Sequence, residues 1–263
     1  MGRLKALLWD VDGTLAESER DGHRVAFNLA FEDCGLPWHW DELHYGELLR
    51  VSGGRERLLR DMAQRTDAPV LADQREALAR EVHGKKNAIY ADLVQSGHIP
   101  LREGVLGLMQ QCHSRGVRMG IATTTSRTNV DALLRMHLGD DWAEGFAVVV
   151  CGEDVQRKKP DPEVYRRALQ TLGIGPLEAV AIEDSPGGVA AARAADVPVV
   201  VTLSSYFASA TIEGAIAIGP GLHARQGWRP ALPRSVDEGS GSGIGADDIE
   251  LWRAQMDTVS QYA

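Results

Sequence analysis

The sequence predicts an α/β fold, with an open parallel sheet as the core and an all-helical cap domain inserted after the first strand. Three observations indicate this fold class. Short apolar runs recur along the 263 residues, and segments with helical periodicity separate them. The first and second apolar runs are about a hundred residues apart, which is far more chain than a single crossover helix needs.

Five apolar runs are the predicted strands. Several of them are apolar on both faces, which is typical of parallel strands that helices cover on each side. Apolar residues between the runs recur at the spacing of amphipathic helices, as in 105–112 and 165–172. Strands and helices in alternation predict right-handed crossovers and hence a parallel sheet. The predicted strands comprise residues 4–9, 117–122, 146–150, 179–182 and 197–201.

The domain boundaries follow from where the strand signals stop. Residues 16–95 contain helical patterns and no strand signal, so we expect them to form the cap, with residues 1–15 and 96–228 forming the α/β core. The segment 229–245 is rich in Pro, Gly and Ser and is predicted to be a flexible linker. Residues 229–263 would comprise this linker and a C-terminal helix with an acidic first turn.

The composition is ordinary for a globular protein and narrows the class of partner. A net charge of −9 argues against a nucleic-acid binder, because no basic excess exists to neutralise phosphates. Three widely separated cysteines fit a reducing compartment better than a disulfide scaffold. The sequence has no cleavable-signal pattern and no apolar run of about 18 residues. We therefore expect a cytoplasmic monomer that binds no membrane.

Polar side chains follow the predicted strands at their carboxyl ends, where open α/β sheets bind ligands. Asp10 and Asp12 come after the first strand, and Thr123 follows the second. A lysine-containing segment, 152–162, follows the third, and the acidic segment 183–188 follows the fourth. Because these ends meet at one edge of a parallel sheet, the sequence predicts a site that combines carboxylates, hydroxyls and a lysine.

These segments carry a resemblance to a known family. "DVDGTL" (10–15), a Thr that closes the second strand, "KKP" (158–160) and "IEDSPGG" (182–188) resemble the four motifs of the haloacid dehalogenase-like phosphohydrolase superfamily, in the same order. The resemblance extends over nearly all of residues 1–205. The inserted segment is similar to that superfamily's helical cap of the beta-phosphoglucomutase type. The resemblance implies a Rossmann-like core and a phosphoryl-transfer reaction.

The resemblance assigns a role to each motif residue. Asp10 is implied as the nucleophile that forms an aspartyl-phosphate, and Asp12 as the acid and base that serves the leaving oxygen and the attacking water. Lys159 is implied as a positive charge beside Asp10, and Thr123 as a hydroxyl donor to the phosphoryl group, with its neighbour Thr124 as an alternative. Members that cleave carbon–halogen bonds lack the second aspartate, so Asp12 favours phosphoryl transfer.

The two aspartates and a phosphate dianion need a cation to offset their repulsion. Like charges ~4 Å apart cost about 4 kcal/mol at an effective dielectric of about 20. A hard divalent ion held by oxygens fits, and we expect Mg²⁺. The implied ligands are Asp10, the backbone carbonyl of Asp12, Asp184, and Glu183 either directly or through water. Lys158 is predicted to be solvent-exposed.

The cap is expected to select the substrate, since the core motifs contact only the phosphoryl group. Arg55, in a Gly-Gly loop, is a candidate for binding a distal phosphate, and Lys86 and Arg127 are further cations. A purely structural role stays open for several candidates, because a Gly pair is often only a turn, and His23 and Phe27 also fit a helical core. The candidate substrate-binding residues are Glu17, His23, Phe27, Gly53, Gly54, Arg55, Lys86, Thr124 and Arg127.

Within the superfamily, "ESE…HR.AFN" (17–28) together with the Gly-Gly-Arg-Glu-Arg loop looks most like the CbbY group. These are phosphatases associated with the Calvin cycle that remove the 1-phosphate of xylulose-1,5-bisphosphate, a Rubisco inhibitor. The resemblance therefore implies a Mg²⁺-dependent sugar-bisphosphate phosphatase with a small phosphosugar substrate. Two alternatives stay open: a sugar phosphomutase that uses the same residues, and a non-catalytic phosphosugar-binding protein.

Overall fold

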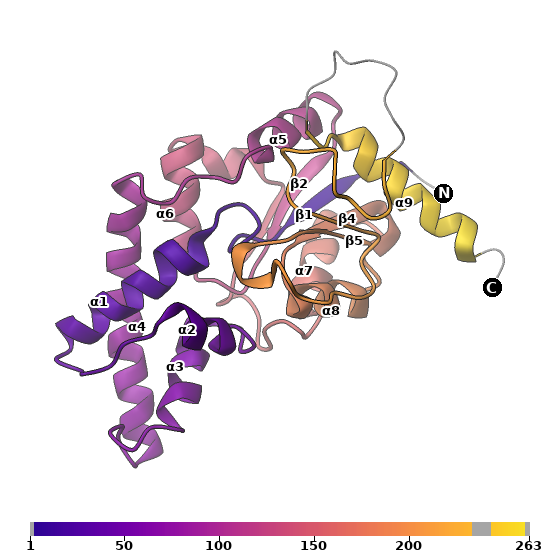
Figure 1. The fold of residues 1–263 in the computed structure, drawn as a ribbon. Helices are drawn as coiled ribbons and strands as arrows, with labels where there is room; N and C mark the ends of the chain where they lie inside the picture. The colour runs from indigo at the N-terminus through magenta and orange to yellow at the C-terminus, as the bar shows by residue number, and fades with distance from the viewer. Residues whose placement is uncertain (1–2, 233–242, 261–263) are drawn as a thin grey trace.

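A computed structural model describes residues 3–232 and 243–260 of the protein. Six parallel strands form one sheet in the order β3-β2-β1-β4-β5-β6, with β1 in the interior (Figure 1). Five of the strands coincide with the predicted apolar runs. The strands are β1 (Ala6–Trp9), β2 (Arg118–Ala122), β3 (Val148–Val150), β4 (Ala179–Glu183), β5 (Val199–Thr202) and β6 (Ala217–Gly219).

The strand register brings the site residues together. Trp9, the last residue of β1, lies opposite Ile121 of β2 and Ile182 of β4. The chain beyond these positions therefore emerges at one edge of the sheet. Asp10 is in this stretch, and it donates its backbone N–H to the carbonyl of Ile182. The aligned strand ends explain why residues so distant in sequence can act in one site.

Helices cover both faces of the sheet because successive strand residues point to opposite sides. Leu7 and Trp9 pack on the face of α5 and α6, whereas Ala6 and Leu8 pack on the face of α7 and α8. The sheet is thus buried on both faces, as the apolar runs predict. The helices are α5 (Val105–Ser114), α6 (Arg127–Leu138), α7 (Glu163–Leu172) and α8 (Pro186–Ala194), with short helical turns η2 (Trp142–Gly145), η3 (Pro176–Glu178) and η4 (Ser205–Phe207).

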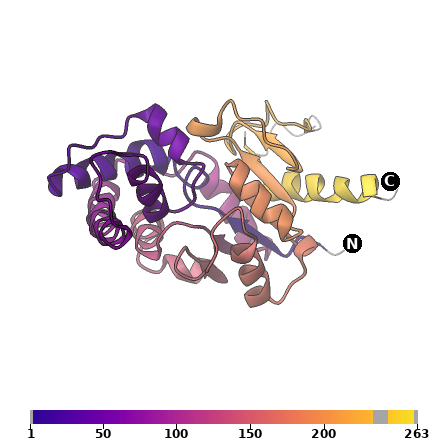
Figure 2. The same cartoon turned by 90° about the horizontal axis from the view of Figure 1, so that it is seen from below.

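The chain between β1 and α5 is all helical and lies beside the carboxyl edge of the sheet (Figure 2). Its own core is aromatic: Phe27 and Trp40 contact each other, and each of them also contacts Phe31 and Tyr45. This arrangement confirms the predicted α/β fold with a helical insertion after the first strand. The inserted helices are η1 (Glu19–His23), α1 (Arg24–Asp33), α2 (Glu42–Leu48), α3 (Gly54–Met62) and α4 (Ala72–Gln95).

Beyond β5 the chain adds structure that the sequence pattern did not predict. Strand β6 extends the sheet, and the backbone of Arg229 pairs with that of Ile218 inside it. Of the linker predicted for 229–245, residues 233–242 lie outside the described part of the chain. A terminal helix, α9 (Ala246–Ser260), follows where the sequence predicts one. No described helix is both long and apolar enough to cross a membrane.

Candidate active site

A cavity of about 610 Å³ lies between the inserted helices and the carboxyl edge of the sheet. The core contributes residues that follow β1, β2, β3 and β4, with Phe207 of η4. The insertion contributes residues from η1, α1, α3 and α4 and from the loop before α3. The predicted site residues that line it are Asp10, Asp12, His23, Phe27, Gly53, Gly54, Arg55, Lys86, Thr123, Thr124, Lys159 and Asp184.

The floor of the site is a buried acidic cluster. Asp10, Glu183 and Asp184 each offer a carboxylate oxygen, and these oxygens lie within 4.8 Å of one another. Burial, opposed by Lys159 and reinforced by Glu183, raises the pKa of Asp10 to about 7. Burial together with the charges of Asp10 and Glu183 also raises the pKa of Asp184 well above its usual range. The cluster therefore holds more negative charge than its surroundings neutralise.

These donors fit a hard divalent cation, which prefers carboxylate oxygens. Glu183 Oε2 is buried without a protein hydrogen-bond partner, so at least one oxygen of the cluster is left for a ligand. Gly13 has a backbone φ of 81°, and a Cβ there would lie 2.0 Å from Asp184 Oδ2. Glycine is therefore required for the loop after β1 to approach the cluster so closely.

Lys159 is the positive charge of the cluster. Its Nζ lies 2.7 Å from Asp10 Oδ1 and 2.6 Å from Glu183 Oε1. Burial alone would lower the pKa of this amine, but the two carboxylates outweigh burial and raise it above its usual range. Tyr165 donates its hydroxyl to the same Glu183 oxygen at 2.5 Å. Lys159 is thus held as an ammonium ion directly beside Asp10.

Asp12 belongs to a different network from Asp10. Its Oδ1 accepts a hydrogen bond from Ser18 Oγ at 2.5 Å and lies 2.9 Å from His23 Nε2. Burial would raise the pKa of Asp12, but His23 and Ser18 outweigh it and hold the pKa below its usual range. The Asp12 carboxylate can only accept, so the His23 hydrogen lies on Nε2, and His23 Nδ1 accepts from Lys86 Nζ at 2.8 Å.

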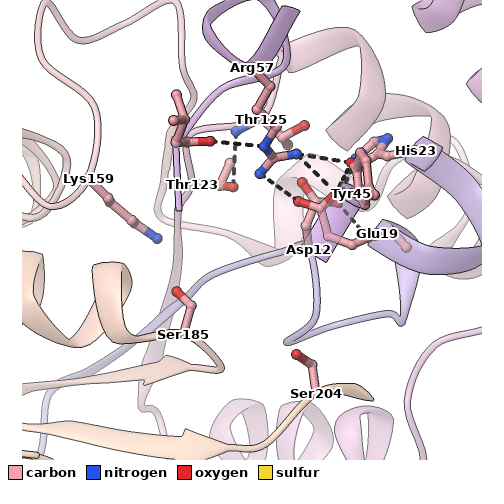
Figure 3. A network of polar contacts seen from close by, with 12 residues as sticks. Asp12, Glu19, His23, Tyr45, Arg57, Thr123, Thr125, Lys159, Ser185 and Ser204 are labelled. Carbon is pink, nitrogen blue, oxygen red and sulfur yellow. Dashed lines mark hydrogen bonds and ion pairs between the residues drawn. The ribbon is translucent and has the colours of Figure 1, made fainter. Parts of the chain in front are cut away.

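A second network, which the sequence pattern did not predict, borders the cavity beside Asp12 and His23 (Figure 3). Arg57 binds Glu19 through two nitrogens, at 2.9 and 3.1 Å, and Tyr45 donates its hydroxyl to the same carboxylate at 2.5 Å. On α3, Arg57 directly precedes the buried Leu58, and this adjacency is the sequence signal that could have indicated a buried arginine. The pair fixes η1 against α3.

Thr123 and Thr124 both line the cavity after β2. The side chain of Thr123 is buried, and its Oγ1 accepts a hydrogen bond from the backbone N–H of Thr125 at 3.3 Å. Ser126 caps α6 by accepting from the backbone N–H of Asn129. The loop therefore presents hydroxyl groups at the start of a helix, where the backbone favours an anion.

Two predicted substrate contacts do not line the cavity. Glu17 accepts hydrogen bonds from the backbone and hydroxyl of Ser205, at 3.2 and 3.0 Å. Arg127 pairs with Asp154 at 2.5 Å, and about half of its side chain is exposed. Lys158, predicted to be solvent-exposed, is only partly exposed and lines the cavity, so that prediction was wrong. The reason is that Lys158 pairs with Glu56 on α3 of the insertion.

The remaining cap candidates line the cavity with different partners. Phe27 is fully buried in the aromatic core of the insertion, and Lys86 lies over its ring at 5.3 Å from the centroid. Arg55 reaches Glu76 at 3.6 Å, with both residues on the insertion. His83 lines the cavity too, and burial lowers its pKa to about 4, so it is neutral at pH 7.

Residues 4–196 match the family described as haloacid dehalogenase-like hydrolase. The chain belongs to this family, and it is a phosphatase enzyme. Within the family it groups with the CbbY type. It is 42% identical over 219 residues to plasmid protein CbbY of Cupriavidus necator, covering 83% of this chain and 86% of that protein. It is 43% identical over 203 residues to protein CbbY of Rhodobacter capsulatus, covering 77% and 87%.

Solved structures agree with the sequence relatives. The crystal structure of CbbY from Rhodobacter sphaeroides in complex with phosphate has a TM-score of 0.75 and 39% identity, covering 81% of this chain and 92% of that one. A mutant of the same protein in complex with xylulose-(1,5)bisphosphate has a TM-score of 0.75 and 38% identity, with the same coverage.

Proposed function

We propose that this protein is a Mg²⁺-dependent sugar-bisphosphate phosphatase that works through an aspartyl-phosphate on Asp10. The observation that carries the proposal is the separation of the two aspartates. Asp10 lies in the acidic cluster against Lys159, whereas Asp12 is held by Ser18 and His23 at the same cavity. Two carboxylates in different surroundings can take different roles.

The reaction has two half-reactions. Asp10 attacks phosphorus, the bond from phosphorus to the sugar oxygen breaks, and Asp12 gives that oxygen its proton. Asp12 then takes a proton from water, whose oxygen attacks phosphorus and releases phosphate and Asp10. The free Asp12 carboxylate suits the second step, and the negative charge of a bound phosphate raises its pKa toward the protonated form that the first step needs.

The proposed Mg²⁺ ligands are Asp10, Asp184, the backbone carbonyl of Asp12, and Glu183 directly or through water. The ion, when bound, would neutralise negative charge on the phosphoryl group and the acidic cluster. Lys159 and Thr123 would bind the phosphoryl oxygens from the other side. Closure of the insertion over the cavity would exclude bulk water from the reacting groups.

We propose xylulose-1,5-bisphosphate as the substrate, with xylulose 5-phosphate and phosphate as products, and hence a role in the Calvin cycle beside Rubisco. The support is the CbbY-type relationship and the phosphosugar bound by the Rhodobacter sphaeroides relative. Cytoplasmic location and a monomeric state stay predictions from the sequence. A beta-phosphoglucomutase-like mutase and a non-catalytic phosphosugar-binding protein are the alternatives.

A phosphate-release screen tests the proposal. With Mg²⁺ present, we expect the fastest release from xylulose-1,5-bisphosphate, slower release from monophosphates such as glucose 1-phosphate, and none from Asp10→Asn or after chelation of the metal. Equal rates on mono- and bisphosphates would contradict the substrate assignment. Conversion of glucose 1-phosphate to glucose 6-phosphate without phosphate release would indicate the mutase. No turnover of any phosphosugar would indicate the binding protein.

A further inference from the structure

The cations that line the cavity differ in how firmly their present partners hold them. Arg57, Lys86 and Lys159 are all buried in fixed contacts. Lys159 lies at the reacting centre beside Asp10, and Arg57 and Lys86 cannot turn toward a second anionic group without leaving a buried polar or charged group unpaired, which is strongly unfavourable. The other two Lys and Arg side chains among the described lining residues are Arg55 and Lys158, and these are partly exposed.

Lys158 joins the sheet domain to the insertion across the cavity. Its Nζ donates to both carboxylate oxygens of Glu56 on α3, at 2.9 and 2.8 Å. The two side chains are 24% and 34% exposed, so water reaches both. Burial would raise the pKa of Glu56, but Lys158 outweighs burial and lowers it. A carboxylate thus occupies the position that an anionic substrate group would take on Lys158.

The loop before α3 is shaped to receive Lys158. Gly53 has a φ of 97°, and a Cβ there would lie 2.5 Å from Lys158 Nζ and 2.9 Å from its Cδ. Only glycine leaves space for the lysine stem along this loop. Gly53, the first glycine of the pair, therefore lies against Lys158 and Glu56, whereas Gly54 lies against His83 and Phe27.

Lys158 is better placed than Arg55 to bind a second phosphate group at a fixed distance from the reacting one. Arg55 pairs with Glu76, and both residues belong to the insertion, so their position depends on the insertion alone. Lys158 directly precedes Lys159, whose amine is 2.7 Å from Asp10. Its amine is therefore anchored to the same loop as a residue of the reacting centre, while facing the opposite wall of the cavity.

We propose that Lys158 is a specificity-determining residue that exchanges Glu56 for the phosphate group that does not react. This inference rests on the proposed function and adds to it the residue that distinguishes a bisphosphate from a monophosphate. A phosphate dianion carries more charge than a carboxylate and competes with it for the ammonium. Glu56 is exposed enough to turn into water when it is displaced.

Steady-state kinetics of the full chain with Mg²⁺ test the exchange. Lys158→Met is expected to raise KM for xylulose-1,5-bisphosphate by roughly 10- to 100-fold, as for loss of a hydrogen bond between charged groups. Its KM for glucose 1-phosphate is expected to change less than about threefold. Glu56→Gln removes the competitor and is expected to lower KM for the bisphosphate.

The second variant distinguishes exchange from a simple latch. If the ion pair only held the insertion closed, Glu56→Gln would raise KM, and Lys158→Met would affect both substrates alike; either result overturns the proposal. Lys85→Met and Glu81→Gln each remove one partner of an ion pair on α4 whose two residues do not line the cavity, and both are expected to leave both KM values unchanged.

A binding experiment separates failure of this inference from failure of the proposed function. If the wild type releases no phosphate from any phosphosugar, the proposed function has failed, and the exchange is then measured by calorimetry with xylulose-1,5-bisphosphate and the Asp10→Asn variant. Addition of Lys158→Met is expected to weaken binding by the same roughly 10- to 100-fold. Equal affinities with and without Lys158→Met overturn the inference.

Discussion

Asp10 and Asp12 lie two residues apart, yet their neighbours give the two carboxyl groups opposite pKa shifts. Asp10 is buried directly after a strand and shares its surroundings with other carboxylates, so its pKa rises to about 7. Asp12 faces His23 and Ser18 at the start of the insertion, and its pKa falls despite burial. Strand β1 ends at Trp9, so both aspartates lie in the loop after it, where each carboxyl group has its own neighbours. Asp10 contacts Lys159 in the acidic cluster, whereas Asp12 contacts Ser18 and His23 at the start of the insertion.

Lys86 gives a prediction about pH. Burial lowers its pKa from 10.5 to about 7 in the folded protein. Between those values the unfolded chain binds a proton that the folded chain does not, so folding becomes more favourable as pH rises. We expect the free energy of unfolding of the wild type, relative to Lys86→Met, to increase by a few kcal/mol from about pH 7 to pH 10.5. Urea titrations across this range measure it.

The exposed neighbour Lys85 is the matched control for this experiment. Lys85→Met should show the same pH dependence as the wild type up to pH 10.5, because the Lys85 side chain is exposed and folding raises its pKa and does not lower it. A difference between wild type and Lys86→Met that stays constant over the whole range would contradict the prediction. Such a result would mean that Lys86 keeps its proton when the protein folds.

At the scale of elements, the two segments that connect the insertion to the sheet lie side by side. Ala16 bridges to Leu101, and the backbone N–H of Arg102 donates to Leu15 at 2.7 Å. The guanidinium of Arg102 also donates to the carbonyl of Gly13, in the loop after β1. Arg102 therefore connects these two segments to the loop that carries both aspartates.

Arg102→Met should destabilise the protein. The guanidinium also donates to the carbonyls of Thr202 at 2.9 Å and Leu203 at 2.7 Å, and a methionine would leave these groups without their partner. We expect the free energy of unfolding to fall by roughly 2–5 kcal/mol. Urea unfolding measures it, with Arg135→Met, an exposed arginine on α6, as the control that should change little. An unchanged midpoint for Arg102→Met would contradict the argument.

The strands and the four motif segments were predictable because each is a local pattern. An apolar run followed by a polar group identifies a strand end, and the parallel register brings these ends together at one edge of the sheet. The Glu19–Arg57 pair was not predictable in the same way. Its partners are 38 residues apart and meet only because of how α3 packs on η1. The partner of Lys158 depends likewise on where the insertion lies over the sheet.

At the scale of the whole molecule, the family match ends at residue 196 but the fold continues. Strand β6 has a weak sequence signal because it is three residues long, whereas an acidic first turn predicts α9 after a segment rich in Gly and Ser. What fixes α9 is contact with distant parts of the chain. Glu250 accepts from the backbone of Leu4, and Trp252 packs on Trp228 with ring centroids 4.7 Å apart.

These contacts place α9 at the far end of the molecule from the chemistry (Figure 2). Leu4 lies just before β1, at the amino end of the sheet, whereas the acidic cluster lies at the carboxyl end.

Trp252 is 1% exposed, so Trp252→Ala removes a large buried side chain and should lower the free energy of unfolding by about 3–5 kcal/mol. The rate of phosphate release at saturating substrate and low temperature should not change. Leu106→Ala, at an exposed position on α5, is the control for both measurements. If Trp252→Ala slowed phosphate release while the protein stayed folded, α9 would be coupled to the site through the sheet, and its role would not be confined to stability.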